Sequence, residues 1–192
     1  MVKVAFIVEG DVEKIVVEKC FIEKNWLEKY NITPIKPVIN AGGGGNLCPK
    51  NIEQYIEQVE TLNPDIIIIL TDLECDPCIE KTKERLGSCD KCHFIIARKS
   101  FEAWFLADDD LLSILTKNAT LHYNHPENTP SMPFDTLKDL MISGSGRGPG
   151  DKVQLAKKVS KLGFDVEKAS THTNCQSAKY FVDKIKSIGQ NS

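Results

Sequence analysis

The chain has 192 residues, of which 41% are hydrophobic and 27% charged, with a formal net charge of −3. These values are ordinary for a soluble globular protein and allow one large domain with a real core. The negative charge excludes a basic footprint over the whole surface, so any nucleic-acid contact must be local. No apolar run reaches the ~18 residues that cross a membrane, and the first residues lack a secretory signal, so we expect a cytoplasmic protein with no membrane contact.

The first half of the chain alternates short apolar runs with helix-spaced segments. The expected strands cover residues 3–8, 33–40, 65–70 and 93–97. The helices expected between the first three strands cover residues 12–30 and 51–62. Strand and helix in alternation predict an α/β fold, a Rossmann-like parallel sheet flanked by helices.

The second half reads as helical. Ser100 is expected to cap a helix that breaks near residues 108–110. Residues 117–150 are rich in proline and glycine, with one short helix near 135–142, which is typical of a lid or binding loop. Two further helices are expected, one capped by Asp151 and ending at Leu162, and a last one over 176–188.

These elements suggest a division of the chain into two parts. Residues 1–116 would form the catalytic core, with an insertion over 75–92. Residues 117–192 would form an irregular loop and a helical extension that packs on the same domain.

Acidic residues follow two of the expected buried strands. Glu9 ends the first apolar run, with Glu13 one helical turn later, and Asp72 and Glu74 follow the third. The carboxyl ends of parallel strands are where open α/β sheets build ligand sites, and clustered carboxylates need a cation such as Mg²⁺ or Mn²⁺ between them. In the alternative interpretation, Glu13 only favours the helix N-terminus, Asp72 is a turn residue and Glu74 is a solvated charge.

The residues around these carboxylates carry a family resemblance. Residues 6–13 (FIVEGDVE) and 68–74 (IILTDLE) resemble the Toprim domain of topoisomerases, bacterial primases and overcoming-lysogenization-defect (OLD) nucleases. Residues 100–108 (SFEAWFLAD) and 173–178 (TNCQSA) resemble a Toprim-like family of unknown function that is related to RloB-type defence proteins. The likeness covers residues 1–110 by motif and the remainder weakly.

The resemblance implies roles for individual residues. Glu9 would be the general acid/base or a metal ligand, and Asp72 and Glu74 would hold metal, joined by Glu13 and Glu102. Glu74 stands where the family usually has an aspartate, which shifts the carboxylate by about one methylene. Asp76 is a candidate to replace it.

Four cysteines have the spacing of a structural zinc site. Cys75 and Cys78 form one C-x₂-C pair, and Cys89 and Cys92 form a second, with ten residues between the pairs. Four thiolates in this arrangement suit a closed tetrahedral Zn²⁺ site. Two thiol pairs without metal, or a redox pair, are the alternatives.

Glycine loops and basic residues are candidate phosphate contacts. Gly43 and Gly44 lie in a glycine loop after the second expected strand, and Arg147 and Lys152 lie in and after a second one. Backbone amides in such loops can approach a phosphate. The alternatives are a flexible turn and a solvated charged face.

The leading hypothesis is a Mg²⁺- or Mn²⁺-dependent Toprim-type nuclease acting on DNA or RNA, with a link to phage defence, whose catalytic residues are Glu9, Asp72 and Glu74. The alternatives are a non-catalytic Toprim-like module that binds nucleic acid or a partner, and a zinc-stabilised adaptor. The sequence leaves open whether a partner ATPase is needed. The hypotheses differ in whether the five carboxylates converge within metal-bridging distance, and divergence would contradict the enzyme. They are Glu9, Glu13, Asp72, Glu74 and Glu102.

Overall fold

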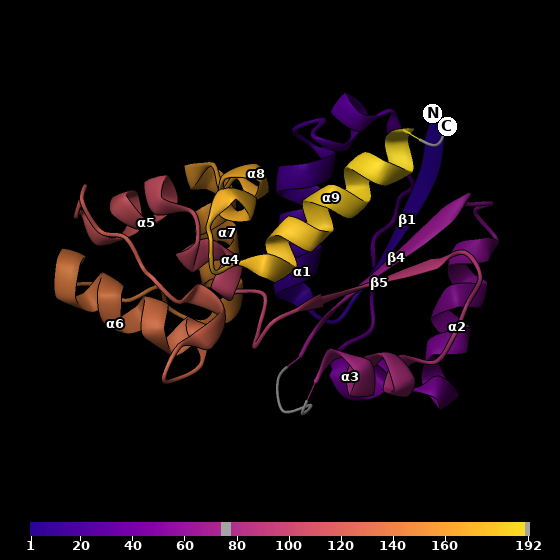
Figure 1. Cartoon of the computed structure of the whole chain (residues 1–192), viewed down its shortest axis with the longest axis horizontal. Coiled ribbons are helices and arrows are strands. Elements are labelled where there is room, and N and C mark those ends of the chain that lie inside the picture. Colours follow the sequence, from indigo (N-terminus) through magenta and orange to yellow (C-terminus); the bar gives the residue numbers. More distant parts are fainter. Residues whose placement is uncertain (74–77, 191–192) are drawn as a thin grey trace.

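A parallel β-sheet lies at the centre of the computed structural model, which describes residues 1–73 and 78–190. Its main strands are β1 (Val2–Val8), β4 (Ile66–Asp72) and β5 (Cys92–Ala97), and the strand order is β2-β1-β4-β5 (Figure 1). Val8 pairs with Leu70, and Asp72 pairs with Ala97. The expected α/β architecture with a parallel sheet is confirmed. The third strand runs two residues further than expected, so that Asp72 is its last residue.

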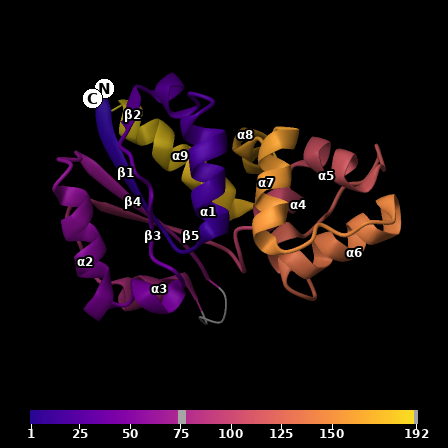
Figure 2. The same ribbon diagram turned by 180° about the vertical axis from the view of Figure 1, so that it is seen from behind.

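Helices cover both faces of the sheet, which explains the continuous apolar strands. Phe6 and Leu70 belong to the core on the face covered by α1 (Asp11–Val16) and α9 (Gln176–Gln190). Ile7 and Ile69 belong to the core on the opposite face, under α2 (Pro49–Glu60) and α3 (Ile79–Leu86). The view from behind shows α1 and α2 on either side of the strands (Figure 2).

The expected second strand is divided into two short pieces. β2 (Ile32–Pro34) and β3 (Ile39–Asn40) both pair with β1, and the cis peptide bond Lys36–Pro37 lies between them. Pro34 and Pro37 have no amide hydrogen to donate to a neighbouring strand. The interruption therefore falls where the sequence restricts pairing.

The expected helix over residues 12–30 is also broken. α1 continues into a π-helical turn, Val17–Ile22, and a separate 3₁₀ turn covers Leu27–Tyr30. Asn25 has a positive φ between them, and Asn31 ends the segment in the left-handed conformation. Asparagine tolerates this conformation better than most residues.

The segment predicted to be a cysteine insertion connects two neighbouring strands. Its described part contains α3, which lies between β4 and β5 in the chain and on the same face as α2 (Figure 1). It thereby serves as the crossover helix of a β-α-β unit, as parallel neighbours require.

The helices of the second half gather beyond one end of the sheet (Figure 1). They are α4 (Ala103–Leu106), α5 (Asp109–Thr116), α6 (Pro133–Ser145), α7 (Lys152–Leu162) and α8 (Val166–Thr171), together with a 3₁₀ turn over Pro126–Asn128. α9 then returns across the sheet and stacks Phe181 on Trp104. In the described parts of the chain, no helix is both long and apolar enough to span a membrane.

Several expected helix boundaries are confirmed in this region, and others are not. Asp108 separates α4 from α5 and accepts a hydrogen bond from the Leu111 amide at 3.1 Å. Asp151 caps α7 by accepting from the Gln154 amide at 2.7 Å.

The Ser100 hydroxyl is buried and has no hydrogen-bond partner in the described part of the chain, so it does not cap α4. α6 is longer than expected, and α8 was not expected.

Candidate functional site

The ends of β1 and β4 bring together residues that are far apart in the sequence. Glu9 directly follows β1, and its amide donates to the Leu70 carbonyl at 3.0 Å. Asp72 ends the neighbouring strand, and both side chains are buried. The parallel register, which pairs Val8 with Leu70, therefore places two acidic side chains at the carboxyl edge of the sheet.

Hydrogen bonds from β4 fix the carboxylate of Glu9. Its Oε2 accepts from the Thr71 hydroxyl and from the Asp72 amide, the latter at 2.9 Å. Its other oxygen, Oε1, faces the glycine loop, where a Cβ added to Gly44 would lie 2.9 Å away. One oxygen of Glu9 is thus anchored, and only glycine fits against the other.

The loop that follows β5 holds Asp72 in the same way. Asp72 Oδ1 accepts a hydrogen bond from the Phe101 amide at 2.8 Å. Its pKa is raised well above the ordinary value, first by burial and then by the negative charges of Glu13, Glu9 and Glu102. Burial and like charges both disfavour an ionised carboxyl.

Glu13 points back to the start of α1, as its position one turn after Glu9 predicts. Its Oε2 accepts from the Gly10 amide at 3.0 Å. Burial, followed by repulsion from Glu102 and Glu9, raises the pKa of Glu13 to about 7. The hydrogen bond at the helix N-terminus, which was the alternative interpretation of Glu13, is therefore present. Glu13 is also repelled by the other carboxylates.

Glu102 completes the cluster from the loop before α4. Its side chain is 2% exposed, and Oε1 lies 3.2 Å from the ammonium of Lys152, the first residue of α7. The second oxygen, Oε2, is buried and has no hydrogen-bond partner in the described part of the chain. A buried carboxylate oxygen without a partner is costly unless a cation or donor joins it.

Lys152 provides positive charge at this cluster. Burial lowers the pKa of Lys152, but Glu102, Asp72 and Glu13 together outweigh burial and raise it. One ammonium group cannot neutralise Glu9, Glu13, Asp72 and Glu102. Burial is the larger cause of the raised pKa values of Glu13 and Asp72, and this excess of negative charge adds to it.

An oxygen-only donor set of this kind suits Mg²⁺ or Mn²⁺ rather than zinc or copper. The orphaned Oε2 of Glu102 is an available ligand atom. In residues 1–73 and 78–190, however, no three His, Cys, Asp or Glu side chains already have the spacing of a metal site. The predicted ligands Glu74 and Asp76 lie outside the described residues.

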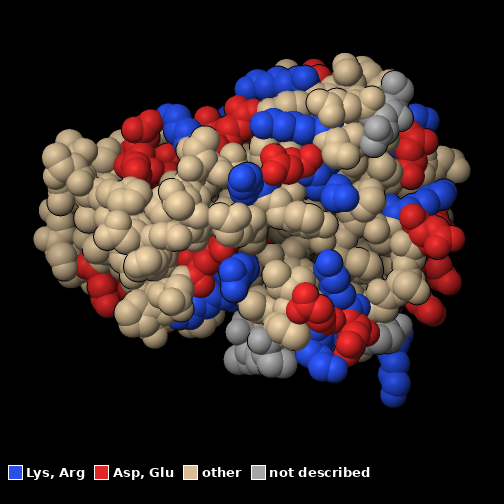
Figure 3. Space-filling model, in the orientation of Figure 1, with Lys and Arg blue, Asp and Glu red and all other residues tan. Residues whose placement is uncertain are grey.

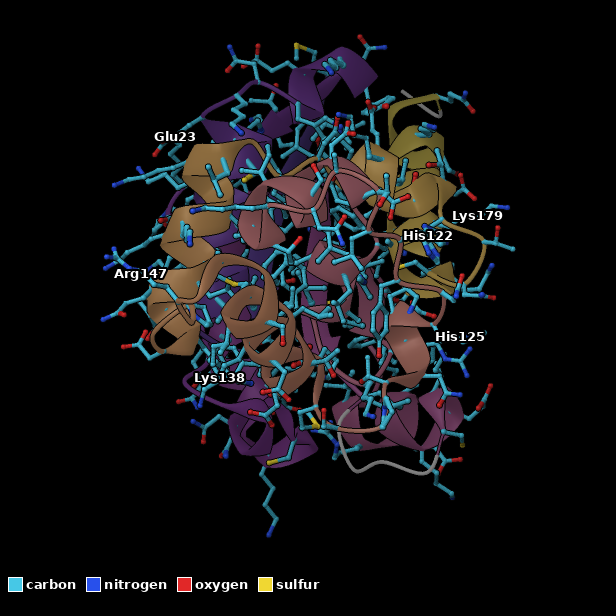
Figure 4. The ribbon with its side chains drawn as sticks, turned by 90° about the vertical axis from the view of Figure 1, so that its left-hand side faces the viewer. Glu23, His122, His125, Lys138, Arg147 and Lys179 are labelled. Atoms are coloured by element: carbon cyan, nitrogen blue, oxygen red, sulfur yellow. A yellow bond between two sulfur atoms is a disulfide. The ribbon has the colours of Figure 1, made fainter. Side chains whose placement is uncertain are left out.

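The predicted phosphate contacts are only partly brought to this site. Gly43 donates its amide to the Glu9 carbonyl at 2.8 Å, and Gly44 lies against the Glu9 side chain. Lys152 reaches the cluster through Glu102. Arg147 does not, since it is exposed and points outward from the loop before α7 (Figure 4).

Two supporting residues carry no role in the sequence-based prediction. Thr71 anchors Glu9, and Arg85 from α3 donates to the Gly44 carbonyl at 3.0 Å, which braces the glycine loop. A polar threonine directly after a run of five aliphatic residues was a signal for the first. No local pattern marks Arg85, because its contact spans 41 residues of sequence.

The predicted zinc ligands show a different arrangement. Cys89 and Cys92 form a disulfide with a Cα–Cα distance of 5.1 Å. Cys78 is a free, half-buried thiol just before α3, and Cys75 lies outside the described residues. The four-cysteine zinc site stays a prediction.

The fold and site therefore define an α/β chain with a buried carboxylate cluster at the carboxyl edge of a parallel sheet. No protein-family model matches the sequence, and no curated protein matches it. Among solved structures, the chain is similar to the C-terminal region of the Burkholderia pseudomallei OLD protein, at 16% identity and a TM-score of 0.48 over 96% of this chain and 99% of that one. The corresponding region of the Xanthomonas campestris pv. campestris OLD protein gives 16% identity and a TM-score of 0.39 over 98% and 96%. Similarities this distant do not establish family, activity or partners.

Proposed function

We propose that this chain is a Toprim-type, divalent-metal-dependent enzyme that hydrolyses phosphodiester bonds in nucleic acid. The observation that carries the proposal is the meeting of Glu9, Glu13, Asp72 and Glu102 at one sheet edge, with a single ammonium and an orphaned carboxylate oxygen. Such a concentration of buried negative charge is costly for stability and is typical of sites built for cations. Mg²⁺ usually binds through one or two carboxylates together with substrate phosphates.

Asp72, Glu13 and Glu102 are the residues that would hold the ion, and Glu74 and Asp76 are further candidates. A bound Mg²⁺ supplies positive charge at the non-bridging phosphate oxygens and at the oxygens that attack and leave. Because Asp72 and Glu13 have raised pKa values, ion binding releases protons from them and is favoured by rising pH.

Glu9 is suited to proton transfer. Two donors hold its Oε2, so its Oε1 stays in one position beside the glycine loop. A fixed, partly desolvated carboxylate oxygen can accept a proton from an attacking water. Lys152 can move from Glu102 to a phosphate oxygen, where its charge opposes the charge that develops during cleavage.

The test is a cleavage panel of DNA and RNA, single- and double-stranded, with Mg²⁺, Mn²⁺ or EDTA. We expect cleavage that requires the metal and is abolished by Glu9→Gln and by Asp72→Asn. Glu23→Gln is the matched control, since Glu23 is exposed and pairs with Lys19 at the surface. Undiminished cleavage by both site variants would overturn the proposal. Nucleic-acid binding without any metal-dependent cleavage would instead favour the non-catalytic module.

A further inference from the structure

A groove crosses the open edge of the sheet between α3 and α9. In the described sheet β5 pairs with β4 alone, and beyond its other edge lies a hollow of about 410 Å³. Phe94 and Ile96 of β5 line it, together with Lys83 of α3 and Tyr180 of α9. Figure 3 shows this face of the molecule, with both basic and acidic side chains around the hollow.

The hollow continues past the end of β5. Arg98 and Gln176 also line a second hollow of about 400 Å³, whose other lining residues include His125, Asn128 and Asn174. The two hollows therefore form one path, with an apolar floor along β5 and a polar part beyond it. Arg98 lies between the two parts.

This path adjoins the carboxylate cluster. Arg98 directly follows Ala97, which pairs with Asp72. Three residues further along, the Phe101 amide donates the hydrogen bond that holds Asp72. The short segment from Arg98 to Phe101 thus has the groove at one end and the cluster at the other.

The groove combines aromatic surface with positive charge. Tyr180 is 47% exposed, although large apolar side chains are mostly buried elsewhere in this fold, and the Lys184 ammonium lies 5.9 Å from its ring centroid. Lys83 and Arg98 line the groove, and its acidic lining residues are Glu80 and Glu127. Glu127 already accepts hydrogen bonds from the Ser177 amide and hydroxyl. Aromatic rings that accept stacked bases, beside cations that follow phosphates, are the features of single-strand binding grooves.

We propose that this groove binds a single strand of nucleic acid that leads to the carboxylate cluster. The inference rests on the proposed function of that cluster and names its substrate class. Bases stack on Tyr180 and Phe94, while Arg98 and Lys83 contact the phosphates. Each hollow has the volume of a small-ligand pocket, which accommodates one or two flexible nucleotides and not a duplex.

The test measures binding in EDTA, where no metal-dependent step occurs. The probes are a short fluorescein-labelled oligothymidine strand and the same strand in a duplex, followed by fluorescence anisotropy. We expect the single strand to bind at least tenfold more tightly than the duplex. Tyr180→Ala should weaken single-strand binding by about 5- to 150-fold, which is the range for losing one stacked base.

Arg98→Gln should weaken binding by a similar factor and also reduce the salt slope, because one phosphate contact on a single strand contributes about 0.7 to that slope. The controls are Ile114→Ala and Lys138→Gln, which remove an exposed apolar side chain from α5 and an exposed charge from α6. Thermal unfolding confirms that each variant is folded. Both controls should bind as the unaltered chain does.

Two results separate this proposal from the proposed function. If Asp72→Asn abolishes cleavage while Tyr180→Ala and Arg98→Gln bind the strand normally, the groove proposal is wrong and the metal-site proposal stands. If the groove variants lose binding while Asp72→Asn still cleaves, the metal-site proposal is wrong and the groove proposal stands. If no nucleic-acid strand binds at all, the groove proposal is wrong. A protein strand that pairs with the open edge of β5 is then the alternative.

Discussion

The carboxylate cluster and the cysteine segment are both predicted from short motifs, but the structure brings their residues together in different ways. Glu9 and Asp72 meet although 63 residues separate them, because neighbouring parallel strands place their carboxyl ends together. Cys89 and Cys92 form a disulfide with each other, and α3 lies between them and Cys78 in the chain. Sheet register therefore assembles the first site, whereas the second depends on how a local connection folds.

The two regions also differ in how their ligand atoms are held. A backbone amide donates a hydrogen bond to each of three carboxylates. The Asp72 amide donates to Glu9, the Phe101 amide donates to Asp72, and the Gly10 amide donates to Glu13. Amide donors that are already in place cost no reorganisation when a ligand arrives. The carboxylates are thus already oriented, at the expense of electrostatic repulsion that a cation or a proton relieves.

Apart from the loss of cleavage expected for Glu9→Gln and Asp72→Asn, the largest effect is expected from removing the Lys152 ammonium of the cluster. Lys152→Met should lower metal-dependent cleavage by about 10²-fold, the cost of losing one charged donor at a reacting phosphate. In EDTA it should also lower the melting temperature at pH 8, above the pKa of about 7 that Glu13 has, but less at pH 5, where Glu13 is protonated. Lys157→Met, an exposed lysine of the same helix, is the control for both measurements.

A loss of stability at pH 5 equal to that at pH 8 would contradict this explanation. It would show that Lys152 acts by packing its aliphatic chain rather than by neutralising Glu102 and its neighbours.

Removing a carboxylate should have the opposite effect on stability. The pKa of Glu13 is raised from 4.5 to about 7, so the folded chain holds a proton that the unfolded chain has released in this pH range. The contribution of Glu13 to stability is therefore largest below pH 4.5 and falls as the pH rises through its folded-state pKa of about 7. In EDTA at pH 8, Glu13→Gln should stabilise the fold by on the order of 1–3 kcal/mol, measured by urea unfolding.

The same variant should respond less to Mg²⁺. Added Mg²⁺ is expected to raise the melting temperature of the unaltered chain at pH 8, since it binds the folded state and relieves the repulsion. Glu13→Gln should gain less. Glu57→Gln, on the exposed side of α2, should change neither quantity. A decrease in stability at pH 8 in Glu13→Gln would mean that its hydrogen bond to Gly10 outweighs the repulsion.

The glycine loop offers a smaller and more local perturbation. A Cβ at Gly44 would lie 2.9 Å from Glu9 Oε1, whereas a Cβ at the next residue, Gly45, meets nothing within 4 Å. Gly44→Ala should therefore displace the free oxygen of Glu9 and reduce cleavage about tenfold, as sub-ångström misplacement of a catalytic group does. Gly45→Ala should cleave normally, and both should melt within a few degrees of the unaltered chain.

Equal activity in the two alanine variants would show that the position of Oε1 is unimportant. Glu9 would then serve structure through Thr71 and Asp72, not proton transfer.

Much of the fold follows from local signals in the sequence. The apolar runs ending at Val8 and Leu70 predict the central strands, and Asp108 and Asp151 mark helix starts through their side-chain oxygens. The π-helical turn after Val16 was not predictable, since its apolar spacing reads as an ordinary helix. α8, at six residues, is too short for periodicity to reveal.

The site was partly predictable for the same reason. Glu9, Glu13 and Asp72 are marked by their places at strand and helix ends, which topology then brings together. Glu102 was suggested by resemblance alone, since nothing in its local sequence places it beside Asp72. Thr71 and the backbone amides that orient the carboxylates act through tertiary contacts, and spacing along the chain does not encode these.

The smallest effect on activity is expected from the cysteine segment. If reduced Cys78, Cys89 and Cys92 bind zinc together with Cys75, chain purified under reducing conditions should contain about one Zn²⁺ by elemental analysis, since four thiolates fill one closed site. Cys89→Ser should lose the metal and lower the melting temperature, while cleavage falls less than about threefold because a structural ion has no open position for substrate. Cys48→Ser, a half-buried free thiol in the loop before α2, should keep the zinc. Reduced protein without zinc would contradict the prediction. Cys89 and Cys92 would then form the disulfide that the structure contains. The carboxylate cluster alone would account for metal dependence.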